Sequence, residues 1–220
     1  MEKFNSELAI KTEKIRKSLK SDNVRILEIN IEYPQFLYDS SSEQISKINS
    51  FYKKFAENYE KYCECRLFRK ILQSDFKKEN FTPYGEIMNN IITYTDEKYI
   101  SVLTDISHYD GYFIKRERMN HIWSVSKGVI LPLNKFLLSP KSRKRIKNEV
   151  GKQIVEQLYN KISNFSLTEN SVKKYAFNVN TDNFFLCKNG IGFWFEPGTL
   201  APESEGFPSF VIPYKKEELL

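Results

Sequence analysis

The stretch Asn183–Tyr214, NFFLCKNGIGFWFEPGTLAPESEGFPSFVIPY, decides the fold more than any other part of the chain. Its Asn189-Gly190 pair is the dipeptide that a two-residue hairpin turn prefers, because both turn positions need positive φ. The flanking segments NFFLC and IGFWFE are rich in aromatic and branched side chains, which favour strands. The proline-rich segment Glu196–Pro208 then indicates a rigid crossing loop before a closing strand, SFVIPY. The stretch therefore predicts a small antiparallel sheet.

Two long amphipathic helices are predicted before this stretch. In residues 39–76, apolar side chains recur at alternating spacings of three and four, which is the period of one helix face. The stripe is rich in tyrosine and phenylalanine, and we interpret it as core. In residues 138–162, apolar residues recur every four positions, and Ser139-Pro140 is typical of a helix start.

Alternating patterns predict strands in the rest of the chain. RILEINIEYPQF, residues 25–36, alternates cleanly and predicts a half-buried antiparallel strand. Residues 83–125 predict three antiparallel strands with turns at Asp96-Glu97 and Asp110-Gly111. VKKYAFNV, residues 172–179, is a further predicted strand. Residues 1–22 carry a thin apolar stripe that favours an N-terminal helix or a charged extension.

These elements predict an α+β protein, in which antiparallel sheet forms two related lobes packed by two long amphipathic helices. The expected boundaries are an N-terminal charged extension or helix over residues 1–22, an N-terminal lobe over residues 23–105, and a C-terminal lobe over residues 106–220.

The charge of the 220-residue chain is concentrated in one place. The net charge is +6, and five cations without an acid among them fall in one short run: Lys141, Arg143, Lys144, Arg145 and Lys147. Without them the net charge is 6 − 5 = +1, which does not favour a general polyanion binder. No apolar run approaches the ~18 residues of a membrane span, and no signal peptide is recognisable. We therefore expect a cytoplasmic protein as the sequence stands, or an extracytoplasmic one if a signal has been removed.

The C-terminal stretch resembles a family of paired extracytoplasmic domains, found in the lysozyme-sensing anti-sigma factor RsiV and the peptidoglycan deacetylase PdaC. The matching positions are Phe185, Gly190, Phe195, Ala201, Pro202, Gly206, Ile212, Pro213 and Tyr214. The order of looser matches extends from about Ile26 to Tyr214. The family's Gly-Gly-Ala-His hairpin is replaced here by Tyr109-Asp110-Gly111-Tyr112. The resemblance implies a non-catalytic binding module that recognises an unknown protein or a cell-wall glycan.

Two segments that flank the family signature are the predicted contact sites. The hairpin contributes Tyr109, Asp110, Tyr112 and Phe113, and the crossing loop contributes Glu196, Glu203 and Glu205. No catalytic residue, cofactor or metal site is predicted, because the sequence contains neither a nucleophile elbow nor zinc spacing.

Other chemistry-bearing residues are interpreted as structural. Both tryptophans, Trp123 and Trp194, lie inside strand patterns that favour core packing, and both histidines are expected to be structural. Two alternatives stay open. The run Lys141–Lys147 could bind nucleic acid, which is the less favoured partner, and Glu203 with Glu205 could serve a hydrolase. The oligomeric state is left open.

Overall fold

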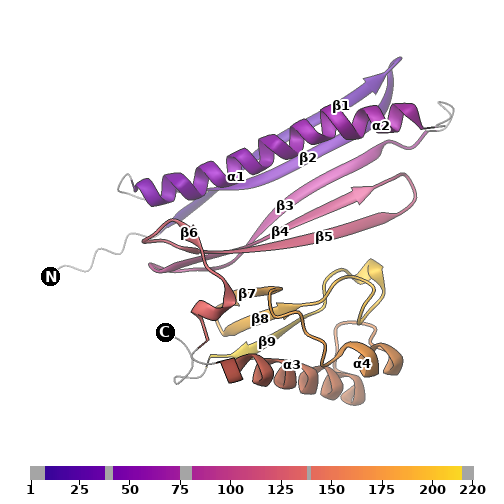
Figure 1. Ribbon diagram of the computed structural model, residues 1–220. Coiled ribbons are helices and arrows are strands. Elements are labelled where there is room, and N and C mark those ends of the chain that lie inside the picture. The colour runs from indigo at the N-terminus through magenta and orange to yellow at the C-terminus, as the bar shows by residue number, and fades with distance from the viewer. Residues whose placement is uncertain (1–7, 38–41, 75–80, 138–139, 215–220) are drawn as a thin grey trace.

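The computed structural model describes residues 8–37, 42–74, 81–137 and 140–214. Figure 1 shows a long helix lying on one face of a large sheet, with a small sheet and two further helices on the opposite side. The helices and sheets are thus stacked as helix, sheet, sheet and helix. This confirms the predicted α+β class, with sheet packed by two long helices.

The large sheet has six strands in sequence order. They are β1 (Ala9–Ser21), β2 (Val24–Leu37), β3 (Tyr84–Thr95), β4 (Tyr99–Tyr109), β5 (Ile114–Ser124) and β6 (Val129–Ile130). Neighbouring strands are antiparallel, except that β2 and β3 run parallel. The parallel pair was not predicted. It arises because the chain between β2 and β3 contains a helical crossover, which parallel neighbours require.

The predicted N-terminal helix is wrong, because Ala9–Ser21 forms the edge strand β1. Asp22 and Asn23 both have positive φ, at 47° and 63°, and turn the chain into β2. Ile15 and Leu19 are four residues apart, a spacing that fits a helix face and also one face of a strand. In the structure they lie opposite Ile31 and Leu27 of β2, so sheet pairing decides between the two periods.

The predicted first helix is confirmed as α1 (Glu43–Tyr62). Ser42 caps it by accepting a hydrogen bond from the Ile45 N–H. The helix passes through a π-helical segment (Cys63–Leu67) into α2 (Phe68–Gln73). The inward face of α1 includes Ile48 and Tyr52, both buried against the large sheet. The stripe is therefore core over its first part, as the spacing predicted, whereas Tyr62 at its end is 46% exposed.

The C-terminal stretch forms the predicted small sheet. Its strands are β7 (Phe184–Cys187), β8 (Gly190–Trp194) and β9 (Ser209–Pro213), all antiparallel. The second predicted helix is α3 (Pro140–Asn160), which packs on β9. The predicted strand over residues 172–179 is wrong, because α4 (Glu169–Tyr175) occupies its first half and the second half is not a strand. Thr168 and Ser171 form a capping box that stabilises the helix start.

β4 is the strand that carries both packing faces. Ile100 and Val102 point toward α1, while Ser101 and Leu103 meet the small sheet. All four are buried. The expected lobe boundary, between residues 105 and 106, lies within β4. The whole of β4 belongs to the large sheet.

Candidate functional site

The hairpin between β4 and β5 is held by a side chain that the sequence singled out. The Asp110 carboxylate accepts hydrogen bonds from the backbone N–H groups of Tyr112 at 2.9 Å and Phe113 at 2.8 Å. These bonds lower the pKa of Asp110. The Tyr109 hydroxyl donates to the Gly111 carbonyl at 2.7 Å, and Gly111 takes the positive φ that the turn requires, 96°. The turn is thus fixed by its own side chains.

This fixed turn presents aromatic rings to solvent. Tyr112 is 88% exposed and Phe113 is 77% exposed, and Ile114 beside them is 44% exposed. We call these three residues the tip surface. Consecutive large apolar side chains with this exposure are unusual enough on a protein surface to indicate a contact site.

The crossing loop approaches the hairpin from the small sheet (Figure 1). Arg116 of β5, three residues after Phe113, donates to the Glu203 carbonyl at 3.2 Å, which joins the crossing loop to the strand that follows the hairpin. Arg118 lies over the Phe207 ring, 4.1 Å from its centroid, and holds the end of the loop against β5. The structure therefore holds the crossing loop against β5, the strand that begins at the hairpin.

The three loop carboxylates do not form one group. Glu203 and Glu205 lie on a short 3-10 turn (Glu203–Glu205), whereas Glu196 lies exposed at the far end of the loop. Glu205 accepts a hydrogen bond from the Ser166 N–H at 2.8 Å, which lowers the pKa of Glu205. A lowered pKa is the opposite of what a general acid needs at neutral pH.

The basic run is spread around the start of α3. Arg143 donates to the Thr181 hydroxyl at 3.2 Å, and Arg145 lines a pocket. Lys144 is exposed and Lys147 is half-buried. The side chain of Lys141 lies outside the described residues. The described cations therefore face different surroundings, with Arg143 directed to Thr181 and Arg145 to the pocket.

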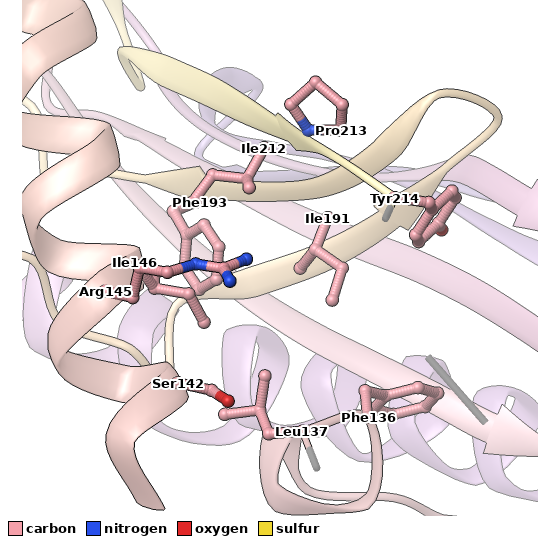
Figure 2. Close-up of a pocket in the computed structure, with 10 residues that line it drawn as sticks. All are labelled: Phe136, Leu137, Ser142, Arg145, Ile146, Ile191, Phe193, Ile212, Pro213 and Tyr214. Carbon is pink, nitrogen blue, oxygen red and sulfur yellow. The ribbon is translucent and has the colours of Figure 1, made fainter. Parts of the chain in front are cut away.

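A small apolar pocket lies between the start of α3 and the small sheet. Figure 2 shows Ile191 and Phe193 of β8 with Ile212 of β9 on one side, and Arg145 extending from α3 toward them. Tyr214, the end of the signature Ile-Pro-Tyr, stands at its rim. The enclosed space is only about 30 Å³, enough for a water-sized group but far below a typical ligand site. The pocket is thus a packing feature of the signature residues.

A buried network of hydrogen-bonded polar side chains under α1 was not predicted from the sequence. Glu86 of β3 is 3% exposed and accepts from the Tyr59 hydroxyl of α1. His108 Nδ1 lies 2.7 Å from the same carboxylate, and His108 Nε2 lies 3.9 Å from Glu117. The hydrogen bond to Glu86 raises the pKa of His108. In sequence Glu86 is one ordinary glutamate before an alternating run, so no local pattern could show that it is buried.

The remaining aromatic and histidine candidates are structural. Trp123 and Trp194 are 4% and 3% exposed, which confirms core packing for both. His121 packs edge-on against Phe51 and Tyr52, and burial lowers its pKa to about 4. Among the described residues, no three His, Cys, Asp or Glu side chains are placed to hold a metal ion. Within the same residues, none of the helices combines the length and the apolar character that crossing a bilayer requires.

Comparison with known proteins shows a family match for the C-terminal part of the chain. Residues 135–215 match the family model described as a protein of unknown function, DUF3298, and this part of the chain is a DUF3298 domain. It contains α3, the small sheet, the crossing loop and the pocket.

Two crystal structures of DUF3298 family proteins are similar over almost the whole chain. One is from Bacteroides fragilis, with a TM-score of 0.66 and 12% identity, covering 95% of this chain and 91% of the other. The second is from Pseudomonas aeruginosa, with a TM-score of 0.63 and 12% identity, covering 94% and 91%. At this identity the likeness shows the fold alone. No curated protein matches the chain.

Proposed function

We propose that this protein is a non-catalytic binding module that contacts a protein or glycan partner through the tip surface, in the manner that its resemblance to the RsiV-like family suggests. The observation that carries the proposal is the exposure of Tyr112 and Phe113 on a turn fixed by Asp110. A turn that is already ordered loses little conformational entropy when a partner binds.

The energetics of the tip surface favour a partner. Burying one large apolar side chain contributes about 1.5–3 kcal/mol, and here two rings and one isoleucine stay in water. Neither ring stabilises the fold from this position. Aromatic rings of this kind also form the central contacts of many interfaces and stack on sugar rings. One nearby carboxylate, Glu203, and two cations, Lys115 and Arg116, give the tip surface the polar rim that such interfaces have.

The described groups offer little support for the hydrolase alternative. Glu203 and Glu205 do not line the pocket between α3 and the small sheet, and the hydrogen bond from Ser166 favours the ionised form of Glu205. His108 has its Nδ1 committed to a buried carboxylate. A general acid or base needs a proton within reach of a bound substrate, and no such arrangement occurs among these groups.

The test replaces Tyr112 by alanine and uses Tyr159→Ala as the matched control. Tyr159 is also a highly exposed tyrosine, at 70%, but it lies on α3. Both variants should melt like the parent protein. Each protein is applied to an array of peptidoglycan fragments and other glycans. In a second experiment, a photo-crosslinking residue is placed at position 113 or at position 159, and the crosslinked partners are captured from cell extract.

We expect Tyr112→Ala to weaken any glycan or protein contact by about tenfold or more, as central interface residues do, while Tyr159→Ala leaves it unchanged. Crosslinks should form from position 113 and not from position 159. The proposal is overturned if the bound glycans and crosslinked partners are the same for both variants and both crosslinker positions.

A further inference from the structure

A basic cleft lies at the other end of β4 from the tip surface. Its volume is about 440 Å³, and its lining residues are Lys98, Tyr99, Ser124, Ser126, Lys127, Leu131 and Lys135. The three lysines come from three separate segments: the turn between β3 and β4, the turn after β5, and the 3-10 helix Leu133–Lys135. The fold therefore gathers cations that are far apart in sequence.

The three ammonium groups have no counter-ion among the described residues, none of which forms a salt bridge with Lys98, Lys127 or Lys135. Two acids precede Lys98, and neither lines the cleft. The Asp96 carboxylate is taken by the backbone N–H groups of Lys98 at 2.8 Å and Tyr99 at 2.6 Å. Like charges around one small space repel each other, and a bound anion would remove that cost.

The cleft also offers uncharged donors. The Ser124 and Ser126 hydroxyls lie 3.3 Å apart, and Ser124 is only 6% exposed, so its position is fixed by its surroundings. In the described part of the chain, no acceptor is found for the backbone N–H groups of Ser126 and Lys127. Hydroxyls and free N–H groups beside cations are the donors that an oxyanion accepts from.

We propose that this cleft binds a tetrahedral oxyanion, a phosphate or sulfate group, carried by a small molecule of about the size of a sugar. The lysines suit a compact multivalent anion, because an ammonium group acts as a point charge with several donors. The volume is larger than a bare phosphate needs and falls within the range of small-molecule sites. The Tyr99 ring and Leu131 supply an apolar wall for the carbon skeleton. The site is separate from the tip surface and from the proposed partner contact.

The test measures binding of inorganic phosphate, glucose 6-phosphate, glucose 6-sulfate and glucose to the full chain by titration calorimetry at low salt. We expect saturable binding of glucose 6-phosphate or glucose 6-sulfate, weaker binding of inorganic phosphate and none of glucose. The two organic probes distinguish a phosphate from a sulfate ligand. Higher salt should weaken binding, because the contacts are ionic.

The variants Lys98→Ala, Lys127→Ala and Lys135→Ala should each weaken binding about tenfold, the effect of one charge-assisted hydrogen bond. Lys54→Ala is the matched control, because Lys54 is an exposed lysine on α1 outside the cleft and removes the same charge. All four substitutions are at the surface, and their melting temperatures verify folding.

Three results overturn the proposal. One is the absence of saturable binding for every oxyanion probe, and another is an equal loss of affinity in Lys54→Ala. The third is binding of a single-stranded DNA oligonucleotide through these lysines with no binding of the small oxyanions, which would make the cleft part of a nucleic-acid surface instead.

Discussion

The Ser101 hydroxyl oxygen on β4 accepts a hydrogen bond from the backbone N–H of Leu186 on β7, at 3.0 Å. β7 is an edge strand of the small sheet, so one side of its backbone has no neighbouring strand. Ser101 is fully buried and satisfies one of these groups from the large sheet. The two sheets are therefore joined by a polar contact within an apolar interface as well as by packing.

Replacing Ser101 by alanine should lower the free energy of unfolding by about 1–3 kcal/mol, because the buried Leu186 N–H loses its acceptor. Thr93, which donates to the same oxygen at 2.8 Å, would lose a partner too. Urea denaturation measures the change. Ser50→Ala on the exposed side of α1 is the control and should change stability by less than about 0.5 kcal/mol. Equal effects of the two substitutions would contradict the role of Ser101.

The features predicted correctly from the sequence are those that depend on residues close together in the chain. The hairpin between β7 and β8 was correctly predicted near Asn189-Gly190, but its turn residues are Lys188 and Asn189, and neither Asn189 nor Gly190 has a positive φ. The tyrosine and phenylalanine stripe correctly predicted α1. Asp110-Gly111 also located the turn that presents Tyr112 and Phe113. Each of these features depends on residues within one turn or one helix face, so the sequence contains the information.

Features that depend on distant pairing could not be predicted in this way. The spacing of Ile15 and Leu19 fits a helix and a strand equally, and only pairing with β2 makes β1 a strand. The cleft lysines, such as Lys98 and Lys135, are separated in sequence and are brought together by the topology. The same holds for Glu86, whose burial depends on α1 covering β3.

Tyr52→Phe should destabilise the protein although it removes only one oxygen atom. Trp123 Nε1 donates to the Tyr52 hydroxyl at 2.9 Å, and both residues are buried. Phenylalanine leaves this N–H without an acceptor, at a cost of about 1–3 kcal/mol. Chemical denaturation followed by tryptophan fluorescence measures the loss. Tyr62→Phe, at a tyrosine that is 46% exposed, should be nearly neutral, and a loss of the same size there would refute the explanation.

His121 should make the protein less stable as the pH falls below about 6.5. Burial lowers its pKa to about 4 in the folded state, so the unfolded chain binds more protons between these two values. Stability then rises with pH across this window, by up to about 1.4 kcal/mol per pH unit for one proton. The difference in unfolding free energy between the parent protein and His121→Phe, measured from pH 4 to pH 7, isolates this effect from the carboxylates. A difference that does not vary with pH would exclude it.

His108 should act in the opposite direction and in a higher pH range. The hydrogen bond to Glu86 raises the pKa of His108, so its stabilising contribution is complete below about pH 6.5 and is lost as the pH rises through the folded-state pKa. The stability advantage of the parent protein over His108→Gln should therefore shrink between pH 6.5 and pH 9. Thermal unfolding across this range measures it, and an advantage that grows with pH would show that the histidine is bound in its neutral form.

Two glycines in sheet strands should respond differently to replacement by alanine. At Gly190 an added Cβ would lie 2.0 Å from the Ile212 carbonyl oxygen, so β9 would have to move away from β8. We expect Gly190→Ala to destabilise the protein by about 1–3 kcal/mol or more, as overpacking does. At Gly85 the nearest atom, Tyr109 Cβ, is at an ordinary 3.5 Å, and φ lies outside the positive range. Gly85→Ala should therefore be neutral or stabilise by up to about 1 kcal/mol, because alanine loses less backbone entropy on folding than glycine. Denaturation midpoints of the two variants measure the difference in stability. If Gly190→Ala is as stable as Gly85→Ala, the close approach of β8 and β9 does not restrict position 190 to glycine.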